Sequence, residues 1–274
     1  EALSAARDAG ADVIVLDHHM AIEELPPAVA VVNPNRLDDP SEHGAIAACG
    51  LTFLYLVALS RALREMNYYE DQGITPPDLM GMLDMVAMGT VCDVVPLLGL
   101  NRVYVSQGLR ILERWNNPGM KALREITGRN GILTPEIFGF DLGPRINAGS
   151  RMGDSRIGSD LLSTDDPELA KELAQRLDDL NVERRAVEAE VMKEARKAAL
   201  ENRAVVPPIL IAGGEGWHPG VIGVVAGRLK SNHRRPAIVV SFEGGLGKGS
   251  GRSIPGINLG ALILEAKDRG LLIE

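Results

Sequence analysis

The chain has 274 residues, of which 45% are hydrophobic and 24% are charged, so it can form one large or two medium packed domains, and global disorder is excluded. Its net charge of -8 excludes a diffuse basic coat for DNA, and its aromatic content of 4% excludes a broad stacking platform for bases. Any nucleic-acid site is therefore expected to be local and mostly polar. The two cysteines are isolated in apolar surroundings, which favours a reducing cytoplasm, and the longest uncharged run, residues 44–60, falls short of a membrane span.

The first half of the chain has the pattern of an α/β layer followed by helices. A short helical pattern covers residues 1–9, and because the chain opens inside it with Glu1 rather than Met, we expect an excised fragment. Residues 12–16, which are apolar after Asp12, and residues 29–32 are apolar runs, as buried parallel strands are. Helices are expected at residues 44–65, 78–88, 101–115 and 118–127, with a polar connection at 68–77.

The second half is organised around one long helix, expected at residues 167–201. Asp166 can cap it, Pro167 suits its first turn, and apolar residues recur at helical spacing. A polar-faced helix of this length is more typical of a bridge between domains than of a core. Strands at 208–212 and 236–240 flank a helix at 219–230. The sequence therefore predicts an α/β fold with a parallel-sheet domain at 1–165, a long connecting helix at 166–202 and a smaller α/β domain at 203–274.

Three polar residues follow the first strand directly. Asp17, His18 and His19 lie where open α/β sheets bind ligands, at the carboxyl end of a strand. Imidazole and carboxylate together suit manganese, zinc or iron. The alternative is a strand end whose histidines are merely capped and solvated.

A further acid, Asp93, is flanked by apolar residues that we expect to bury it. A buried carboxylate needs a cation or hydrogen-bond donors, so Asp93 is either a metal ligand or a helix-capping or arginine-paired residue. Even with Asp93, these residues form an incomplete site for two metals, and we expect the remaining ligands to lie outside this chain.

Residues 141–154 are rich in glycine and contain Arg145, Asn147 and Arg151. Guanidinium groups and an amide on a turning backbone suit phosphate oxygens. The alternative is an ordinary loop whose arginines pair with Asp141 and Asp154.

Two stretches near the C-terminus suggest an anion site. Residues 244–253 contain Lys248, Ser250, Arg252 and Ser253 among glycines, although a flexible hairpin tip would have the same composition. Trp217 and His218 precede a helix whose first turn favours an anion, and Trp217 could stack on a base. Equally, Trp217 could anchor the core and His218 could cap the helix.

Taken together, these stretches resemble the DHH phosphoesterase superfamily, and within it the branch of single-stranded-DNA-specific exonucleases. The matching segments occur in family order over nearly the whole chain: VIVLDHH (13–19), VVNPN (31–35), GTVCDVVPL (89–97), LGPRINA (142–148), GWHPGVIGVVA (216–226) and GKGSGRS (247–253). The first motif marks only the superfamily, whereas the last two resemble the exonuclease branch. The resemblance implies a DHH domain joined by a long helix to a smaller DHH-associated domain.

The resemblance also implies an activity: metal-dependent hydrolysis of single-stranded DNA from its 5′ end to 5′-mononucleotides, in recombination and repair. His18 and Asp93 would then be ligands of a Mn²⁺ or Mg²⁺ pair, with His19 beside the scissile phosphate and Asp17 supporting the site. The expected partners are single-stranded DNA and a repair helicase or single-strand-binding protein, without a membrane. The DNA- and phosphate-binding residues would be Arg145, Asn147, Arg151, Trp217, His218, Lys248, Ser250, Arg252 and Ser253.

The sequence also departs from the family pattern. The upstream Asp-x-Asp motif and the next metal-binding aspartate are not in this chain, nor are the later Gly-Gly-His stretch and an oligonucleotide-binding barrel, and Ser150 stands where the family has glycine. We therefore expect these residues alone to be nearly inactive. Two rival functions remain: a DHH phosphodiesterase for short oligonucleotides or cyclic dinucleotides, and a catalytically silent DNA-binding scaffold.

Overall fold

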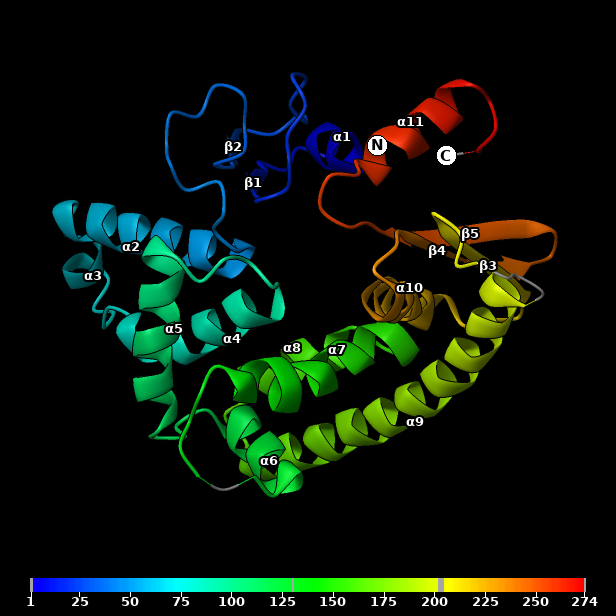
Figure 1. Cartoon of the computed structure of the whole chain (residues 1–274). Coiled ribbons are helices and arrows are strands. Elements are labelled where there is room, and N and C mark those ends of the chain that lie inside the picture. The colour runs from blue at the N-terminus through cyan, green and yellow to red at the C-terminus, as the bar shows by residue number, and fades with distance from the viewer. Residues whose placement is uncertain (1, 130, 202–204, 274) are drawn as a thin grey trace. The chain divides into compact units, whose positions relative to one another are not determined.

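The computed structural model describes residues 2–129, 131–201 and 205–273 (Figure 1). The chain divides into two compact units, Glu1–Pro144 and Arg145–Glu274. This division lies earlier than the expected domain boundary at residue 165, and the expected boundary at residue 203 lies outside the described residues. In the part of the chain that is described, no helix has both the length and the apolarity needed to cross a membrane.

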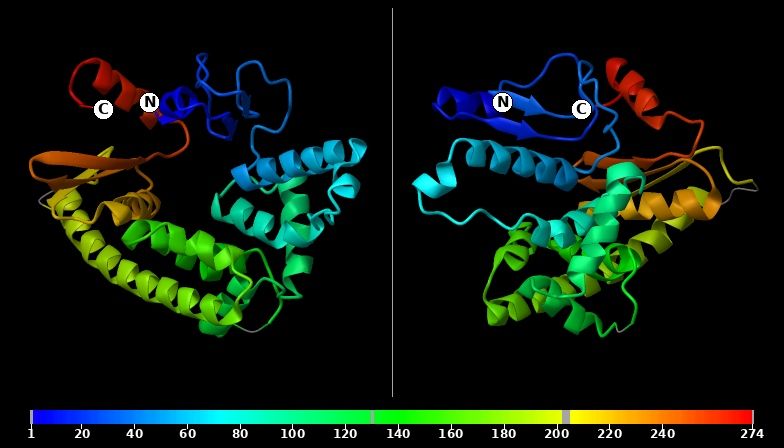
Figure 2. Two further views of the ribbon diagram at one scale, coloured as in Figure 1. Left: turned by 180° about the vertical axis from the view of Figure 1, so that it is seen from behind. Right: turned by 90° about the vertical axis from the view of Figure 1, so that its left-hand side faces the viewer.

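A small parallel sheet begins the first unit. The strands β1 (Ile14–Leu16) and β2 (Ala30–Val32) pair with Ile14 opposite Ala30 and Leu16 opposite Val32, which confirms two parallel strands at the expected apolar runs (Figure 2). Helix α1 (Ala2–Asp8) precedes them, and no residue of α1 is buried. The sheet matters for function because β1 delivers Asp17 and the two histidines at its carboxyl end.

Helices form the rest of the first unit, and glycine allows two of them to approach closely. A Cβ on Gly108 of α5 would lie 2.3 Å from both the Ala87 Cβ and the Leu83 carbonyl oxygen of α4, so only glycine fits there. The expected polar connection at 68–77 contains a short helix. The helices of this unit are α2 (Ala48–Glu65), α3 (Tyr68–Asp71), η1 (Met80–Met82), α4 (Leu83–Cys92), α5 (Gly99–Leu112), α6 (Pro118–Thr127) and η2 (Ile137–Leu142).

Residues 141–154 are mostly helical, so the expected turning loop is wrong. The end of η2 runs directly into α7 (Gly143–Met152), which spans the point where the two units divide. Its glycines provide close packing and not turns: a Cβ on Gly149 would lie 3.1 Å from the Leu177 side chain. Sequence composition alone does not separate a glycine that turns the backbone from one that admits a neighbour.

The long helix α9 (Pro167–Leu200) is unbroken, as expected (Figure 1). The Asp166 side chain accepts hydrogen bonds from the backbone N–H groups of Glu168 and Leu169, which caps the first turn. Its buried Glu188 is compensated by Arg184, at 2.6 Å, and by Arg228, at 2.7 Å. Because Arg228 belongs to α10 (Pro219–His233), this carboxylate links the two helices.

The second unit contains a three-stranded sheet in the order β3-β4-β5. Strands β3 (Leu210–Glu215) and β4 (Ala237–Glu243) are parallel and are joined through α10, and β5 (Leu246–Arg252) is antiparallel to β4. Alternate residues such as Leu210, Ala212 and Val239 are buried in a core shared with α9 and α10. The remaining helices are α8 (Arg156–Ser163) and α11 (Leu259–Asp268).

Most of the glycine-rich stretch 244–253 is also regular structure. Gly244 and Gly245 have φ of +56° and +83° and form the two-residue turn of a hairpin, and Leu246–Arg252 is strand β5. The stretch is therefore a turn and a strand and not an extended loop, and because β5 lies at the edge of the sheet, only alternate N–H groups of β5 bond to β4.

Candidate functional site

Asp17 organises the turn that follows β1. Its Oδ1 accepts hydrogen bonds from the backbone N–H groups of His18, at 2.8 Å, and His19, at 3.2 Å, and contacts His19 Nδ1 at 2.7 Å. The hydrogen bond from the His19 side chain holds the Asp17 pKa below its ordinary value, and the same contact raises the pKa of His19. Asp17 thus fixes the His19 ring, which is 81% exposed, by one of its two nitrogens.

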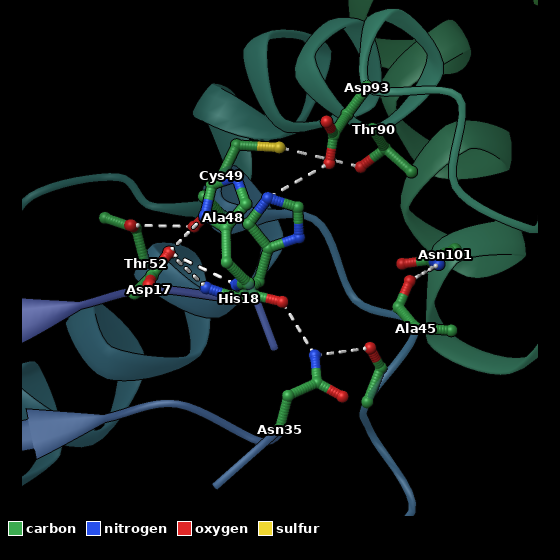
Figure 3. A network of polar contacts seen from close by, with 12 residues as sticks. Asp17, His18, Asn35, Ala45, Ala48, Cys49, Thr52, Thr90, Asp93 and Asn101 are labelled. Atoms are coloured by element: carbon green, nitrogen blue, oxygen red, sulfur yellow. Dashed lines mark hydrogen bonds and ion pairs between the residues drawn. The ribbon is translucent and has the colours of Figure 1, made fainter. Parts of the chain in front are cut away.

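His18 turns the other way and faces Asp93. Its Nε2 lies 3.4 Å from Asp93 Oδ2, which brings together two groups that are far apart in the sequence (Figure 3). The His18 side chain is only 17% exposed. The end of a strand and the end of a helix therefore present one nitrogen and one carboxylate oxygen to the same point.

The expected burial of Asp93 is wrong. Its side chain is 39% exposed because Asp93 is the C-cap of α4, where the helix ends. The next residue, Val94, has φ of +61° and is 85% exposed, so the apolar neighbours turn away instead of enclosing the carboxylate. Among the described residues Asp93 has no arginine partner, and its ion pair is with His18.

Two asparagines that sequence reasoning treated only as a turn hold the backbone of the histidines. Asn33, which is 4% exposed and follows β2, donates to the His19 carbonyl at 2.9 Å. Asn35 donates to the His18 carbonyl at 2.6 Å and to the Gly44 carbonyl at 2.9 Å (Figure 3). The parallel pairing of β1 and β2, which puts both strand ends at one edge, is the signal that could have found them.

The donor types at this site fit a hard divalent cation in part. An imidazole nitrogen and a carboxylate oxygen suit Mn²⁺, and the oxygen also suits Mg²⁺. Within the described ranges no group of three or more His, Cys, Asp or Glu side chains is close enough to hold a metal ion. His18 and Asp93 therefore offer two donor atoms to a cation.

The nearby cysteines are packing residues. Cys49 donates to the Val86 carbonyl at 3.3 Å, and a Cβ on Gly89 would lie 2.6 Å from its sulfur. Burial raises the pKa of Cys49, and it raises the pKa of Cys92 to about 11. Both thiols are therefore protonated near neutral pH.

The arginines of α7 are held by partners within the second unit. Arg145 Nε donates to Asp178 of α9 at 2.7 Å, and Arg151 donates to the Gly220 carbonyl at 3.2 Å. The ion pairs seen for Asp141 and Asp154 are with Arg129 and Arg156. Asn147 lies on α7 between the two arginines and is exposed.

Trp217 does not face solvent, so the expected stacking on a base is wrong. It is 6% exposed, belongs to the core beneath the sheet, and donates its Nε1 hydrogen to Glu194 Oε2 at 2.6 Å. His218 is the N-cap of α10, where its Nδ1 accepts from the Gly220 N–H at 3.0 Å. The structure therefore agrees with the alternatives given for these residues, in which Trp217 anchors the core and His218 caps the helix.

The polar residues of β5 form a row. Strand alternation puts Lys248, Ser250 and Arg252 on one face, and Arg252 donates to Ser250 Oγ at 3.2 Å. Ser250 Oγ and Arg252 Nη2 each lie 3.1 Å from where a Cβ on Gly223 of α10 would be, so this glycine leaves room for them. Ser253 is separate from the row: its hydroxyl donates to the Ile257 carbonyl at 2.7 Å.

Comparisons with known proteins agree with this arrangement. Residues 1–90 match the DHH family, N-terminal domain, and residues 204–270 match the DHHA1 domain. The single-stranded-DNA-specific exonuclease RecJ of Dickeya dadantii is 41% identical over 256 residues, which are 91% of this chain and 44% of that relative. The chain thus spans less than half the length of this curated relative.

Solved structures extend the likeness to the fold. The crystal structure of RecJ from Thermus thermophilus in complex with Mn²⁺ matches with a TM-score of 0.80 and 32% identity, over 99% of this chain and 38% of that chain. The complex with Mg²⁺ from the same organism matches with a TM-score of 0.71 and 31% identity, over 97% of this chain and 38% of that chain. These findings confirm the expected α/β fold and the resemblance to DHH proteins. The chain belongs to the RecJ family of DHH proteins.

Proposed function

We propose that this protein is a metal-dependent 5′ to 3′ exonuclease that hydrolyses single-stranded DNA to 5′-mononucleotides. One observation carries the proposal: His18 Nε2 and Asp93 Oδ2, which are 3.4 Å apart, converge at the carboxyl end of β1. The relatives named for this activity, and the Mn²⁺ and Mg²⁺ in two solved RecJ structures, support it. The activity is proposed for a protein of the relatives' full length.

In the proposed site, His18 and Asp93 hold a Mn²⁺ or Mg²⁺ ion of a two-metal pair. When bound, such cations would supply positive charge that stabilises negative charge on the phosphate. Asp17 anchors His19 through Nδ1, which leaves Nε2 on an exposed ring to contact the scissile phosphate. The Asp17 contact raises the pKa of His19, and a protonated Nε2 would donate a hydrogen bond to a phosphate oxygen.

The β5 row is proposed to bind the DNA backbone. Lys248 and Arg252 have no carboxylate partner among the described residues, so both cations are available to phosphates. Ser250, Ser253 and His218 add polar groups, and Asn147 and Arg151 of α7 provide a second set of contacts. Arg145, which is bound to Asp178, positions α7 against α9.

The cellular setting belongs to the same proposal. We assign the protein to DNA recombination and repair in the cytoplasm, with a repair helicase or a single-strand-binding protein as its helper. The two free cysteines support a reducing compartment. These assignments follow from the proposed exonuclease activity.

Release of mononucleotides from 5′-phosphorylated single-stranded DNA with Mn²⁺ tests the proposal. The chain of the relatives' length should release them, and its Asp93→Ala variant should not. Cleavage of only dinucleotides or cyclic dinucleotides would replace the proposal with a small-substrate phosphodiesterase. DNA binding without any cleavage would indicate a silent scaffold.

The 274 residues alone should bind Mn²⁺ weakly and have little activity, because two of their side chains converge at the site. Calorimetric titration with Mn²⁺ measures this affinity. Two tight sites in these residues would contradict the proposed ligand set.

A further inference from the structure

A cluster of cations surrounds one tryptophan where α5 ends and α6 begins. A pocket of about 470 Å³ is lined by residues that include Arg114, Trp115, Lys121, Arg124 and Arg129. Residues 110–129 carry five basic and two acidic side chains in a chain whose net charge is -8. None of these residues belongs to the site at the end of β1 or to the β5 row.

Three of these cations are not neutralised by carboxylates. Arg129 pairs with Asp141 and lies 3.8 Å from Glu136. By contrast, Arg114, Lys121 and Arg124 have no ion pair with any described residue, and Arg114 and Lys121 are exposed. The one acidic residue in the lining is Glu125. The pocket therefore keeps a local positive charge that an anion can use.

The tryptophan is held in place against the cations. The Arg124 guanidinium carbon lies 4.5 Å from the centre of the Trp115 ring, which is a cation–π contact. Trp115 has φ of +49°, a left-handed conformation that is unfavourable for a bulky residue, and its N–H bonds to the Leu112 carbonyl. The ring is half-buried and lies beside Arg124.

We propose that this pocket, lined by Arg114, Trp115, Lys121 and Arg124, is an auxiliary binding site for single-stranded DNA. Arg114 and Lys121 would contact successive phosphates, and a base would stack on the Trp115–Arg124 pair. Proteins that bind single strands without sequence preference place cations along the phosphate backbone and aromatic rings on which any base can stack. The shared ligand chemistry is a base carrying a phosphate. A strand is favoured over a free nucleotide because Arg114 and Lys121 add two further cations to the pocket that holds the Trp115–Arg124 pair.

Tryptophan fluorescence tests the site locally. Trp115 and Trp217 are the only tryptophans, and Trp217 is buried, so quenching by an added thymidine oligonucleotide of about ten nucleotides reports on Trp115. We expect quenching at low salt, and its loss in Trp115→Phe. The double variant R114Q/K121Q should weaken this binding about tenfold and flatten its salt dependence.

The matched control is R61Q/R64Q, which removes two exposed cations from α2 of the same unit. Equal weakening in this control, or no quenching in the unaltered protein, overturns the proposal. So does thymidine monophosphate binding as tightly as the oligonucleotide, because the site would then recognise a nucleotide and not a strand.

This site does not depend on the proposed exonuclease activity. Asp93→Ala should leave the Trp115 quenching unchanged, since Asp93 does not line the pocket. If the unaltered chain of the relatives' length shows quenching but no nuclease activity, the proposed function alone is refuted. Nuclease activity without quenching would refute the auxiliary site alone.

Discussion

The turn after β1 and the row on β5 present polar groups by different means. His18 and His19 lie in a turn whose backbone is held by side chains, chiefly those of Asp17, Asn33 and Asn35. Lys248, Ser250 and Arg252 instead stand on a regular strand whose backbone pairs with β4. The backbone of the turn is held by individual side chains, whereas the backbone of β5 is held by its hydrogen bonds to β4. Single substitutions should therefore damage the first site structurally and change the second only chemically.

The largest effect is expected for Asp93→Ala in a chain of the relatives' length. Loss of one proposed metal ligand should lower exonuclease activity by about 100-fold or more, which mononucleotide release would measure. Because Asp93 is 39% exposed at a helix end, the fold should persist. Asp71→Ala, which removes an exposed acid from α3, is the control. Activity equal to that of the control would remove Asp93 from the site.

Asn35→Ala should separate positioning from ligation. It removes the hydrogen bonds to the His18 and Gly44 carbonyls, and leaving these partners unsatisfied should cost about 1–3 kcal/mol of the free energy of unfolding. Denaturant titration measures that loss, and calorimetry should show weaker Mn²⁺ binding even though no ligand has changed. Asn232→Ala, at an exposed position of α10, should change neither quantity.

Arg252→Ala should have a smaller effect on the other region. Loss of one phosphate contact should weaken single-strand binding several-fold and reduce the slope of log affinity against log salt by about 1. Thermal unfolding should be unaltered, because the strand and not the side chain holds β5 in place. Arg196→Ala removes an exposed cation from α9 and should leave the slope unchanged. An equal change in both variants would exclude Arg252 from the DNA-binding row.

The smallest effect concerns the titration of the Asp17–His19 contact. The pKa of Asp17 is lowered, so its contribution to stability is present above 3.8 and is lost as the pH falls through its folded value. The pKa of His19 is raised, so its contribution is present below 6.5 and is lost as the pH rises through its folded value. The contact therefore contributes most to the stability of the folded state between pH 3.8 and pH 6.5. An NMR titration should show the His19 pKa falling towards 6.5 in Asp17→Asn, and no change would rule out the contact in solution.

The sequence by itself determined the class of fold, the family and the positions of the main elements. Apolar runs located β1 and β2, and the capping residue Asp166 located the start of α9, because both signals act between near neighbours in the chain. It also placed Asp17 and the histidines at a strand end. Local patterns were sufficient wherever the cause of the structure was local.

Only the tertiary structure decided what glycine-rich segments and apolar neighbours do. Residues 141–154 are mostly helical, and most of residues 244–253 form a strand. Gly149 leaves room for a side chain of α9, and Gly223 leaves room for two side chains of β5. Asp93 is exposed because α4 ends there, and Trp217 is buried because a core closes over it. Burial depends on residues distant in the sequence, and for that reason the partner of His18 and the roles of Asn33 and Asn35 emerged only from the fold.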